Sequence, residues 1–220
     1  VLERHGLADR LGELARAGVE ISRRAAGPKR WVYTELYAPK PVPGALVFAS
    51  VGPTGKLLLM GDVTEEEIYD AFREQLVALE QGGADACCIE TMSALDEACL
   101  AVRAAREHTR LEVLCTFTFQ HAADGSYRTM MGVAPGDAAA AAAEAGAAIV
   151  GANCGQGMAQ MADIVRAMRA AVPDKPILVQ ANAGMPKNVD GVDVFPETPA
   201  TMAGYVPAVV AAGADLIGGC

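Results

Sequence analysis

The chain has 220 residues, 52% of them hydrophobic, so it is long enough to bury a core without the help of disulfides. Its formal net charge is −9 and only 5% of its residues are aromatic, which disfavours nucleic acids and anionic membranes as partners. Glu144 and Gly146 interrupt the alanine tract that begins at Ala138, and no apolar run reaches the roughly 18 residues of a membrane span. We therefore expect one soluble globular domain.

The ends of the chain and its cysteines indicate a compartment. The sequence begins at Val1 and has no basic start followed by an apolar stretch, so we expect a cytoplasmic protein without a signal peptide, whose natural ends are missing. Its six cysteines lack the short, dense spacing of a disulfide scaffold. We expect reduced thiols, with metal binding as the functional alternative.

The first expected element is a helix over about residues 8–26. The segment Lys29–Gly44 fits no repeating unit, and we interpret it as an extended excursion without an assigned role. A first strand follows at Leu46–Val51. At three later points in the chain, a helical pattern ends at a glycine followed by alanine, and a short apolar run begins directly after it. This pattern is expected where a helix ends and a strand that is covered on both faces begins. These joints of a parallel sheet lie at Gly83, Gly146 and Gly213.

The joints and the strand-like runs between them predict the fold class. Each strand-plus-helix unit takes about 32 residues, close to the roughly 31 of a (β/α)₈ TIM barrel, although spacing alone does not exclude a Rossmann-type sheet. Six units use up the chain, so we expect an incomplete barrel whose first strands precede Val1 and whose extreme C-terminal end is missing. The predicted strands are 46–51, 84–90, 113–119, 147–154, 177–181 and 214–220, and the later helices are 65–81, 94–107, 135–145, 158–171 and 199–212.

Helix starts agree with this phasing. Thr64 and Ser93 each stand three residues before a carboxylate, the spacing of a hydroxyl cap, and Thr198 precedes a first-turn proline. We therefore expect caps at all three positions.

Candidate functional residues lie at strand ends, because the active site of a parallel barrel lies at the carboxyl ends of its strands. Two predicted strands end in cysteine, at Cys154 and Cys220, and such a pair on one rim could ligate a soft metal such as zinc. On spacing alone, buried core thiols are the alternative, since a catalytic zinc site needs three protein ligands. The other cysteines are interpreted as core residues: Cys87, Cys88, Cys99 and Cys115.

Other strand ends carry polar groups with two interpretations each. Glu90 is placed either to bind a substrate ammonium or to cap the following helix. Asn153 and Asn182 either orient the site through their amides or satisfy strand-end backbone groups. Gly52-Pro53-Thr54-Gly55 lacks the spacing and the lysine of a P-loop, so we interpret it as a tight turn that a ligand can approach. His121 is either a metal or acid–base residue or a solvated loop residue.

In combination these local sequences resemble the homocysteine S-methyltransferase family, in particular the homocysteine-binding domain of its cobalamin-dependent methionine synthases. The resemblance runs in order from about Leu7 to Cys220. The motifs that carry it are Gly52-Pro53-Thr54-Gly55, Ile89-Glu90-Thr91, Gly151-Ala152-Asn153-Cys154-Gly155, Asn182-Ala183-Gly184-Met185-Pro186 and Gly218-Gly219-Cys220.

The resemblance implies a zinc-bearing barrel in which the thiol of homocysteine binds the metal as a thiolate and accepts a methyl group. Cys154 and Cys220 match two of the family's metal ligands, while the third, a second consecutive cysteine, would fall one residue beyond this chain. Methylcobalamin on another domain or protein is the expected donor, although related proteins use betaine or S-methylmethionine. The residues expected to bind the substrate are Glu90, Thr54, Asn153 and Asn182.

The leading hypothesis is thus a zinc-dependent methyltransferase that converts homocysteine to methionine, with residues 1–220 forming one homocysteine-binding barrel domain truncated at both ends. Its expected partners are homocysteine, or a similar thiol, and a corrinoid-binding domain or protein. One alternative is a metal-free barrel lyase or aldolase, which would need a strand-end lysine or a late phosphate-binding loop. Another is a non-catalytic barrel module that has lost its metal site.

Overall fold

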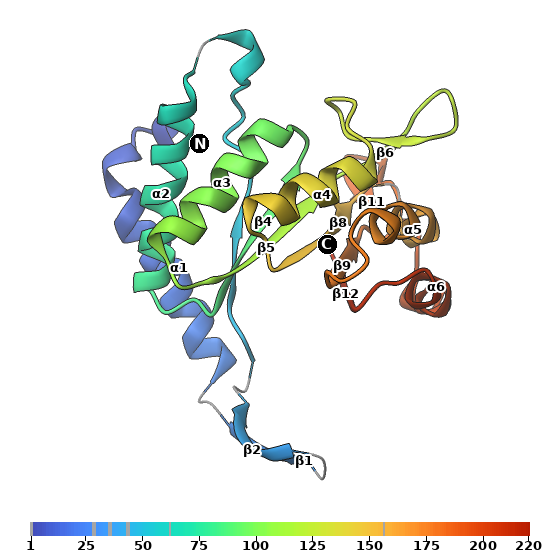
Figure 1. Ribbon diagram of the computed structural model, residues 1–220, viewed down its shortest axis with the longest axis horizontal. Coiled ribbons are helices and arrows are strands. Elements are labelled where there is room, and N and C mark those ends of the chain that lie inside the picture. Colours follow the sequence, from blue (N-terminus) through green and yellow to red (C-terminus); the bar gives the residue numbers. More distant parts are fainter. Residues whose placement is uncertain (1, 28–29, 35–36, 43–44, 62, 156) are drawn as a thin grey trace.

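A curled parallel sheet of six strands forms the centre of the protein (Figure 1). The computed structural model describes residues 2–27, 30–34, 37–42, 45–61, 63–155 and 157–220. Along the sheet the strand order is β12-β9-β8-β5-β4-β3, and every neighbouring pair is parallel. The strand bounds are β3 Phe48–Val51, β4 Ala86–Met92, β5 Glu112–Phe117, β8 Ile149–Cys154, β9 Ile177–Ala181 and β12 Leu216–Gly219.

Helices connect these strands one after another. Their bounds are α1 Leu11–Ala26, α2 Glu65–Gln81, α3 Leu95–His108, α4 Pro135–Ala145, α5 Met161–Ala171 and α6 Pro199–Ala211. Each strand therefore pairs with the next sheet strand of the chain, with no reversal of strand order of the kind that marks a doubly wound sheet. This order confirms the predicted incomplete (β/α)₈ barrel over the Rossmann-type alternative. Within the described residues, no helix is both long and apolar enough to cross a membrane.

Two faces of the sheet follow from the alternation of side chains along each strand. One set of alternate residues packs against the helices in the main core; its central members are Val51, Ile89, Val113, Val150 and Val179. The opposite set forms a separate, small cluster of Ala86, Cys88, Leu114 and Leu178, with Ile149 and Leu216 against it. The helices thus cover the outer face, and the small cluster lines the concave inner face, as in the interior of a barrel.

Local sequence signals set the helix ends. Thr64 and Glu67 form the reciprocal capping box at the start of α2, and the Thr198 hydroxyl accepts the Thr201 N–H at the start of α6, as predicted. The joint glycines adopt the expected left-handed backbone, with φ of 89° at Gly83, 112° at Gly146 and 113° at Gly213.

The expected cap at Ser93 is wrong. Helix α3 begins at Leu95 with Ala94 as its N-cap, and no side chain bonds to that cap. Asp96, inside the first turn, accepts the Glu97 N–H at 2.8 Å and so satisfies one of the free donors at the helix start. The Ser93 carbonyl instead accepts the hydroxyl of Thr129 at 2.7 Å.

Smaller elements were not predicted. The helices expected from residues 8 and 158 begin as 3₁₀ turns, Ala8–Arg10 and Met158–Gln160, before α1 and α5. The excursion at 29–44 is extended, as expected, and its described part is an antiparallel hairpin of β1 Arg30–Thr34 and β2 Tyr37–Val42; Lys29 and Gly44 lie outside the described residues. Two further hairpins occupy loops that follow sheet strands: β6 Gln120–His121 with β7 Tyr127–Arg128, and β10 Lys187–Val189 with β11 Val192–Val194.

Candidate thiol site at the carboxyl ends of the strands

Two cysteine sulfurs meet at the carboxyl edge of the sheet. Cys154 ends β8 and Cys220 follows β12, and their Sγ atoms are 3.0 Å apart. Strand β9 lies between the two strands and holds both ends in place: Cys220 N–H donates to the Ala181 carbonyl at 3.0 Å, and Asn182 N–H donates to the Cys154 carbonyl at 3.1 Å. The predicted convergence of the two cysteines on one rim is therefore observed, and their role as ligands stays a prediction.

An unusual backbone conformation directs the Cys154 side chain. Alternation along β8 would send it toward the helices, on the side of Val150 and Ala152. Instead Cys154 has φ 55°, in the left-handed region that residues other than glycine rarely adopt. Thr91, in β4, has φ 64°, and its hydroxyl lies 3.9 Å from the Cys154 sulfur.

A buried amide connects these two residues. Asn153 is only 1% exposed. Its Oδ1 accepts the Thr91 backbone N–H and the Thr116 hydroxyl, both at 2.8 Å, while its Nδ2 donates to the Thr91 hydroxyl at 2.7 Å and to the Cys154 sulfur at 3.3 Å. The network therefore joins β4, β5 and β8 directly beneath the thiol pair.

Glu90 lies on the same rim and is half-buried. Its carboxylate accepts the Ser50 hydroxyl from the edge strand β3. It also contributes to the electrostatics of the thiol pair: burial above all, then the Cys154 thiol and the Glu90 charge, raise the pKa of Cys220 to about 11. The Cys220 thiol is consequently protonated at neutral pH in the metal-free chain, and a bound cation would favour the opposite state.

The two remaining predicted substrate residues have clear partners. Thr54 donates its backbone N–H and its hydroxyl to Glu97 Oε1, at 2.7 and 2.6 Å, so the buried Glu97 carboxylate fixes the turn after β3. Asn182 donates its side-chain amide to the Gly155 carbonyl at 3.1 Å and so holds the loop after Cys154. Contact of Thr54, Asn182, Asn153 or Glu90 with a substrate stays a prediction.

The donor set fits a soft metal ion. Two thiolates on one tetrahedral zinc lie roughly 3.8 Å apart for a Zn–S distance of about 2.3 Å, so a small rotation of either side chain would accommodate the ion between the two sulfurs. Within the described ranges, no group of three or more histidine, cysteine, aspartate or glutamate side chains is arranged to hold a metal. The cysteine pair would thus supply two ligands, and a tetrahedral zinc would need at least one more protein ligand.

The other cysteines largely confirm their interpretation as core residues. Cys87, Cys88 and Cys115 are buried, and burial is the main cause that raises the pKa of each thiol, to about 12 for Cys87 and Cys88. Cys99 is only half-buried in α3, which corrects its expected place in the core. His121 is exposed and packs edge-on against the Tyr127 ring, with a centroid distance of 5.3 Å.

The sequence predicted no specific role for three residues of the rim. Thr91, Thr116 and Glu97 carry the hydrogen bonds that organise the rim. A signal existed for Thr116, a polar residue inside an apolar strand, and Thr91 lies within a quoted motif. None existed for Glu97, whose partner lies 43 residues earlier in the chain.

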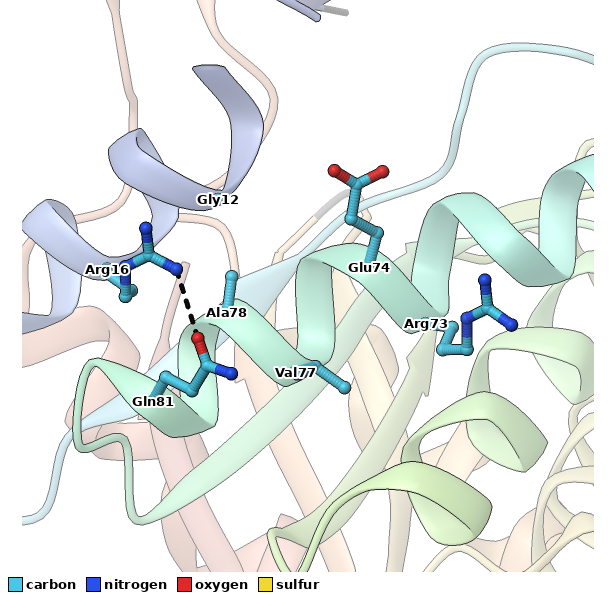
Figure 2. A pocket seen from close by; sticks show the side chains of 7 residues that line it. All are labelled: Gly12, Arg16, Arg73, Glu74, Val77, Ala78 and Gln81. Carbon is cyan, nitrogen blue, oxygen red and sulfur yellow. Dashed lines mark hydrogen bonds between the residues drawn. The ribbon is translucent and has the colours of Figure 1, made fainter. Parts of the chain in front are cut away.

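Two hollows of the surface lie beside other elements. A cavity of about 370 Å³ lies between α1 and α2, where Arg16 donates to Gln81 at 3.1 Å (Figure 2). A second cavity, of about 710 Å³, reaches from the N-terminal segment to Thr54 in the turn after β3. Neither is lined by Cys154 or Cys220.

Comparison with known proteins agrees with this geometry. The sequence model of the family described as "Homocysteine S-methyltransferase" matches residues 1–220. Methionine synthases of Mycobacterium tuberculosis and Mycobacterium leprae are each 30% identical over 221 residues, which cover 98% of this chain and 17% of the relative. The chain therefore spans about a sixth of the length of these curated relatives.

Solved structures show the same fold. The homocysteine methyltransferase MmuM from Escherichia coli superposes in its apo form with a TM-score of 0.62 and 23% identity, over 82% of this chain and 59% of MmuM. Its metallated form gives a TM-score of 0.61 and 24% identity, over 80% of this chain and 56% of MmuM. Because the family model matches residues 1–220, the chain belongs to the homocysteine S-methyltransferase family.

Proposed function

We propose that this chain supplies the homocysteine-binding part of a zinc-dependent methyltransferase that forms methionine. The observation that carries the proposal is the 3.0 Å approach of the Cys154 and Cys220 sulfurs at the carboxyl edge of the sheet, in a chain of the homocysteine S-methyltransferase family. Active sites of parallel barrels lie at this edge.

The chemistry follows from the properties of thiols. A free thiol has a pKa near 8.5, and zinc, when bound, supplies the charge that keeps a substrate thiol in its nucleophilic thiolate form at neutral pH. Cys154 and Cys220 would hold the ion, and their anionic sulfurs leave electron density on the substrate sulfur. In the transfer, the substrate thiol loses its proton, a sulfur–methyl bond forms, and the bond from the methyl group to its donor breaks.

The rim residues give the substrate its orientation in this proposal. Glu90, half-buried at the end of β4, would accept hydrogen bonds from the substrate ammonium. Asn182 and Thr54 hold the loops after Cys154 and β3, and so shape the walls on either side.

Methylcobalamin, carried on another domain or protein, is the donor we propose. The methionine synthases that match this chain are about six times its length, which leaves room for further domains in those relatives. The described cysteines are all free, which suits a reducing compartment such as the cytoplasm.

Zinc analysis of the longest natural form of the polypeptide tests the function. Cys154→Ser should abolish zinc retention and methyl transfer to homocysteine while the circular dichroism spectrum and Tm stay near wild type. Cys99→Ser is the matched control, because Cys99 lies half-buried on α3 and should keep both properties.

The outcomes separate the alternatives. If Cys154→Ser keeps both zinc and activity, Cys154 is only a structural thiol and the proposal is wrong. A wild-type protein that lacks zinc but catalyses a lyase or aldolase reaction would support the metal-free enzyme. A protein that shows neither zinc nor any turnover would be a non-catalytic module.

A further inference from the structure

We propose that Asn153 is a positioning residue: its side-chain amide holds Cys154 in the left-handed conformation that turns the Cys154 sulfur toward Cys220. The proposal rests on the proposed function only where Cys154 is treated as a metal ligand. The juxtaposition of amide and thiols exists without any metal.

The orientation of the Asn153 amide is fixed by its neighbours. The Thr91 backbone N–H can only donate, so the atom that faces it at 2.8 Å must be the amide oxygen. The Thr116 hydroxyl donates to the same oxygen at 2.8 Å. The amide nitrogen therefore faces the other way, toward the Thr91 hydroxyl at 2.7 Å and the Cys154 sulfur at 3.3 Å.

The amide has no capacity left for a substrate. Its oxygen accepts two hydrogen bonds and its nitrogen donates two, which uses every position that a primary amide offers. The residue is also only 1% exposed. Asn153 therefore acts on the chemistry of the site through Cys154, and this role replaces the contact with the substrate that the sequence predicted for it.

Among the described residues, three other than glycine have a left-handed backbone, and Asn153 bonds two of them; the third, Asp190, lies in the turn between β10 and β11. Cys154 at φ 55° and Thr91 at φ 64° both occupy a backbone region that is costly for side chains with a Cβ, and especially so for β-branched threonine. Such conformations persist only where surrounding contacts determine them. The hydrogen bonds of one amide to Thr91 N, Thr91 Oγ1 and Cys154 Sγ are those contacts.

Thiol–disulfide equilibrium in the metal-free chain measures this positioning directly. The reduced chain is equilibrated with glutathione and glutathione disulfide, and the peptide that links Cys154 to Cys220 is quantified by mass spectrometry. Forming that disulfide oxidises two protein thiols and reduces one glutathione disulfide to two glutathiones, so the equilibrium constant reports the effective concentration of one sulfur at the other.

Three variants separate positioning from general stability. Asn153→Ala removes all four hydrogen bonds of the amide. It should lower the effective concentration roughly five- to thirtyfold, because these bonds no longer offset the free-energy cost of the left-handed backbone at Cys154. Asn153→Asp keeps the acceptor oxygen but loses both N–H donors, and should show a similar fall. Thr116→Val is the control: it removes one donor to the amide oxygen, leaves the N–H to sulfur bond, and should stay near wild type.

A cobalt titration supplies a second readout. Co²⁺ alone is added to each reduced variant of the longest natural form of the polypeptide, and the sulfur-to-cobalt charge-transfer absorption is followed. Loss of a partner that orients a metal ligand typically lowers metal affinity about 10- to 100-fold, which is the fall expected for Asn153→Asp but not for Thr116→Val.

The outcomes keep this inference distinct from the proposed function. If wild type forms the disulfide readily but binds no cobalt, the metal proposal fails, and a fall in the Asn153 variants still supports positioning. If both Asn153 variants fold with wild-type Tm and keep the wild-type effective concentration, positioning by Asn153 is wrong. Should Asn153→Ala fail to fold, Asn153→Asp against Thr116→Val decides the matter.

Discussion

The two faces of the sheet are built from alternate residues of the same six strands, yet their side chains are buried to very different degrees. On the outer face, strands and helices share one large core with many fully buried side chains. The inner face has a cluster of only four buried residues, and Phe48 on its edge strand is 43% exposed. In this six-stranded sheet, which ends at β3, the outer face therefore supplies most of the apolar packing, while the polar residues of the thiol site lie on the inner face and its rim.

Matched deletions of phenylalanine should give the largest contrast. Phe72, on α2, is 2% exposed and packs in the outer core, so Phe72→Ala should lower the free energy of unfolding by about 3–5 kcal/mol. Phe48→Ala removes the same atoms from the inner edge and should cost about 1 kcal/mol or less. Urea unfolding measures both; equal losses would mean that the inner face is as closed in solution as the outer one.

Two glycines of the sheet strands, Gly151 and Gly218, differ in the room that they leave for a side chain. A Cβ at Gly151 would lie 2.0 Å from the Leu178 carbonyl oxygen, so Gly151→Ala must push β8 away from β9 and should cost about 3 kcal/mol. A Cβ at Gly218 would lie nearest to the Gln180 side chain, at 3.3 Å, which can move aside, and 3.9 Å from the Val179 carbonyl oxygen, an ordinary van der Waals contact. Thermal unfolding should therefore show a much smaller loss for Gly218→Ala, and a Gly151→Ala protein of wild-type Tm would contradict the close approach of these strands.

Two adjacent cysteines, Cys87 and Cys88, should show the smallest difference, but they compare the accessibility of the two faces directly. Cys87 faces the outer core and Cys88 the inner cluster, and burial raises the pKa of both to about 12. Because both values lie above the working range, alkylation of each by iodoacetamide should rise about tenfold per pH unit between pH 8 and 10. Peptide mass spectrometry should nevertheless find Cys88 modified severalfold faster at every pH. Equal rates would show that the inner face is no easier to reach.

Much of the architecture was predictable because it depends on local signals. Glycines at positions 83, 146 and 213 end helices and are followed at once by buried runs, and the periodicity of these joints predicted the barrel. Cys154 and Cys220 were predicted to meet because parallel strands bring their carboxyl ends to one edge. The first inference required only the spacing of these joints, and the second required only that the strands be parallel.

The conformation of the rim was not predictable for a physical reason. A left-handed cysteine contradicts local propensity, and it is held by bonds between Asn153 and Thr91, which lie 62 residues apart in the chain. Ser93 has the sequence pattern of a cap, but its carbonyl is engaged by Thr129, 36 residues later, and the helix begins after it. Tertiary contacts of this kind override local preference and leave no pattern in a single sequence.

The strictly sequential strand order has a consequence for how such a sheet forms. Each strand hydrogen-bonds only to its predecessor and successor among the sheet strands, so the pairings join segments about one strand-helix unit apart. Contact order is therefore low for a parallel sheet, and each strand pairing closes only a short loop, at a small entropy cost. A nascent chain can therefore dock each new unit onto the one already made as it leaves the ribosome.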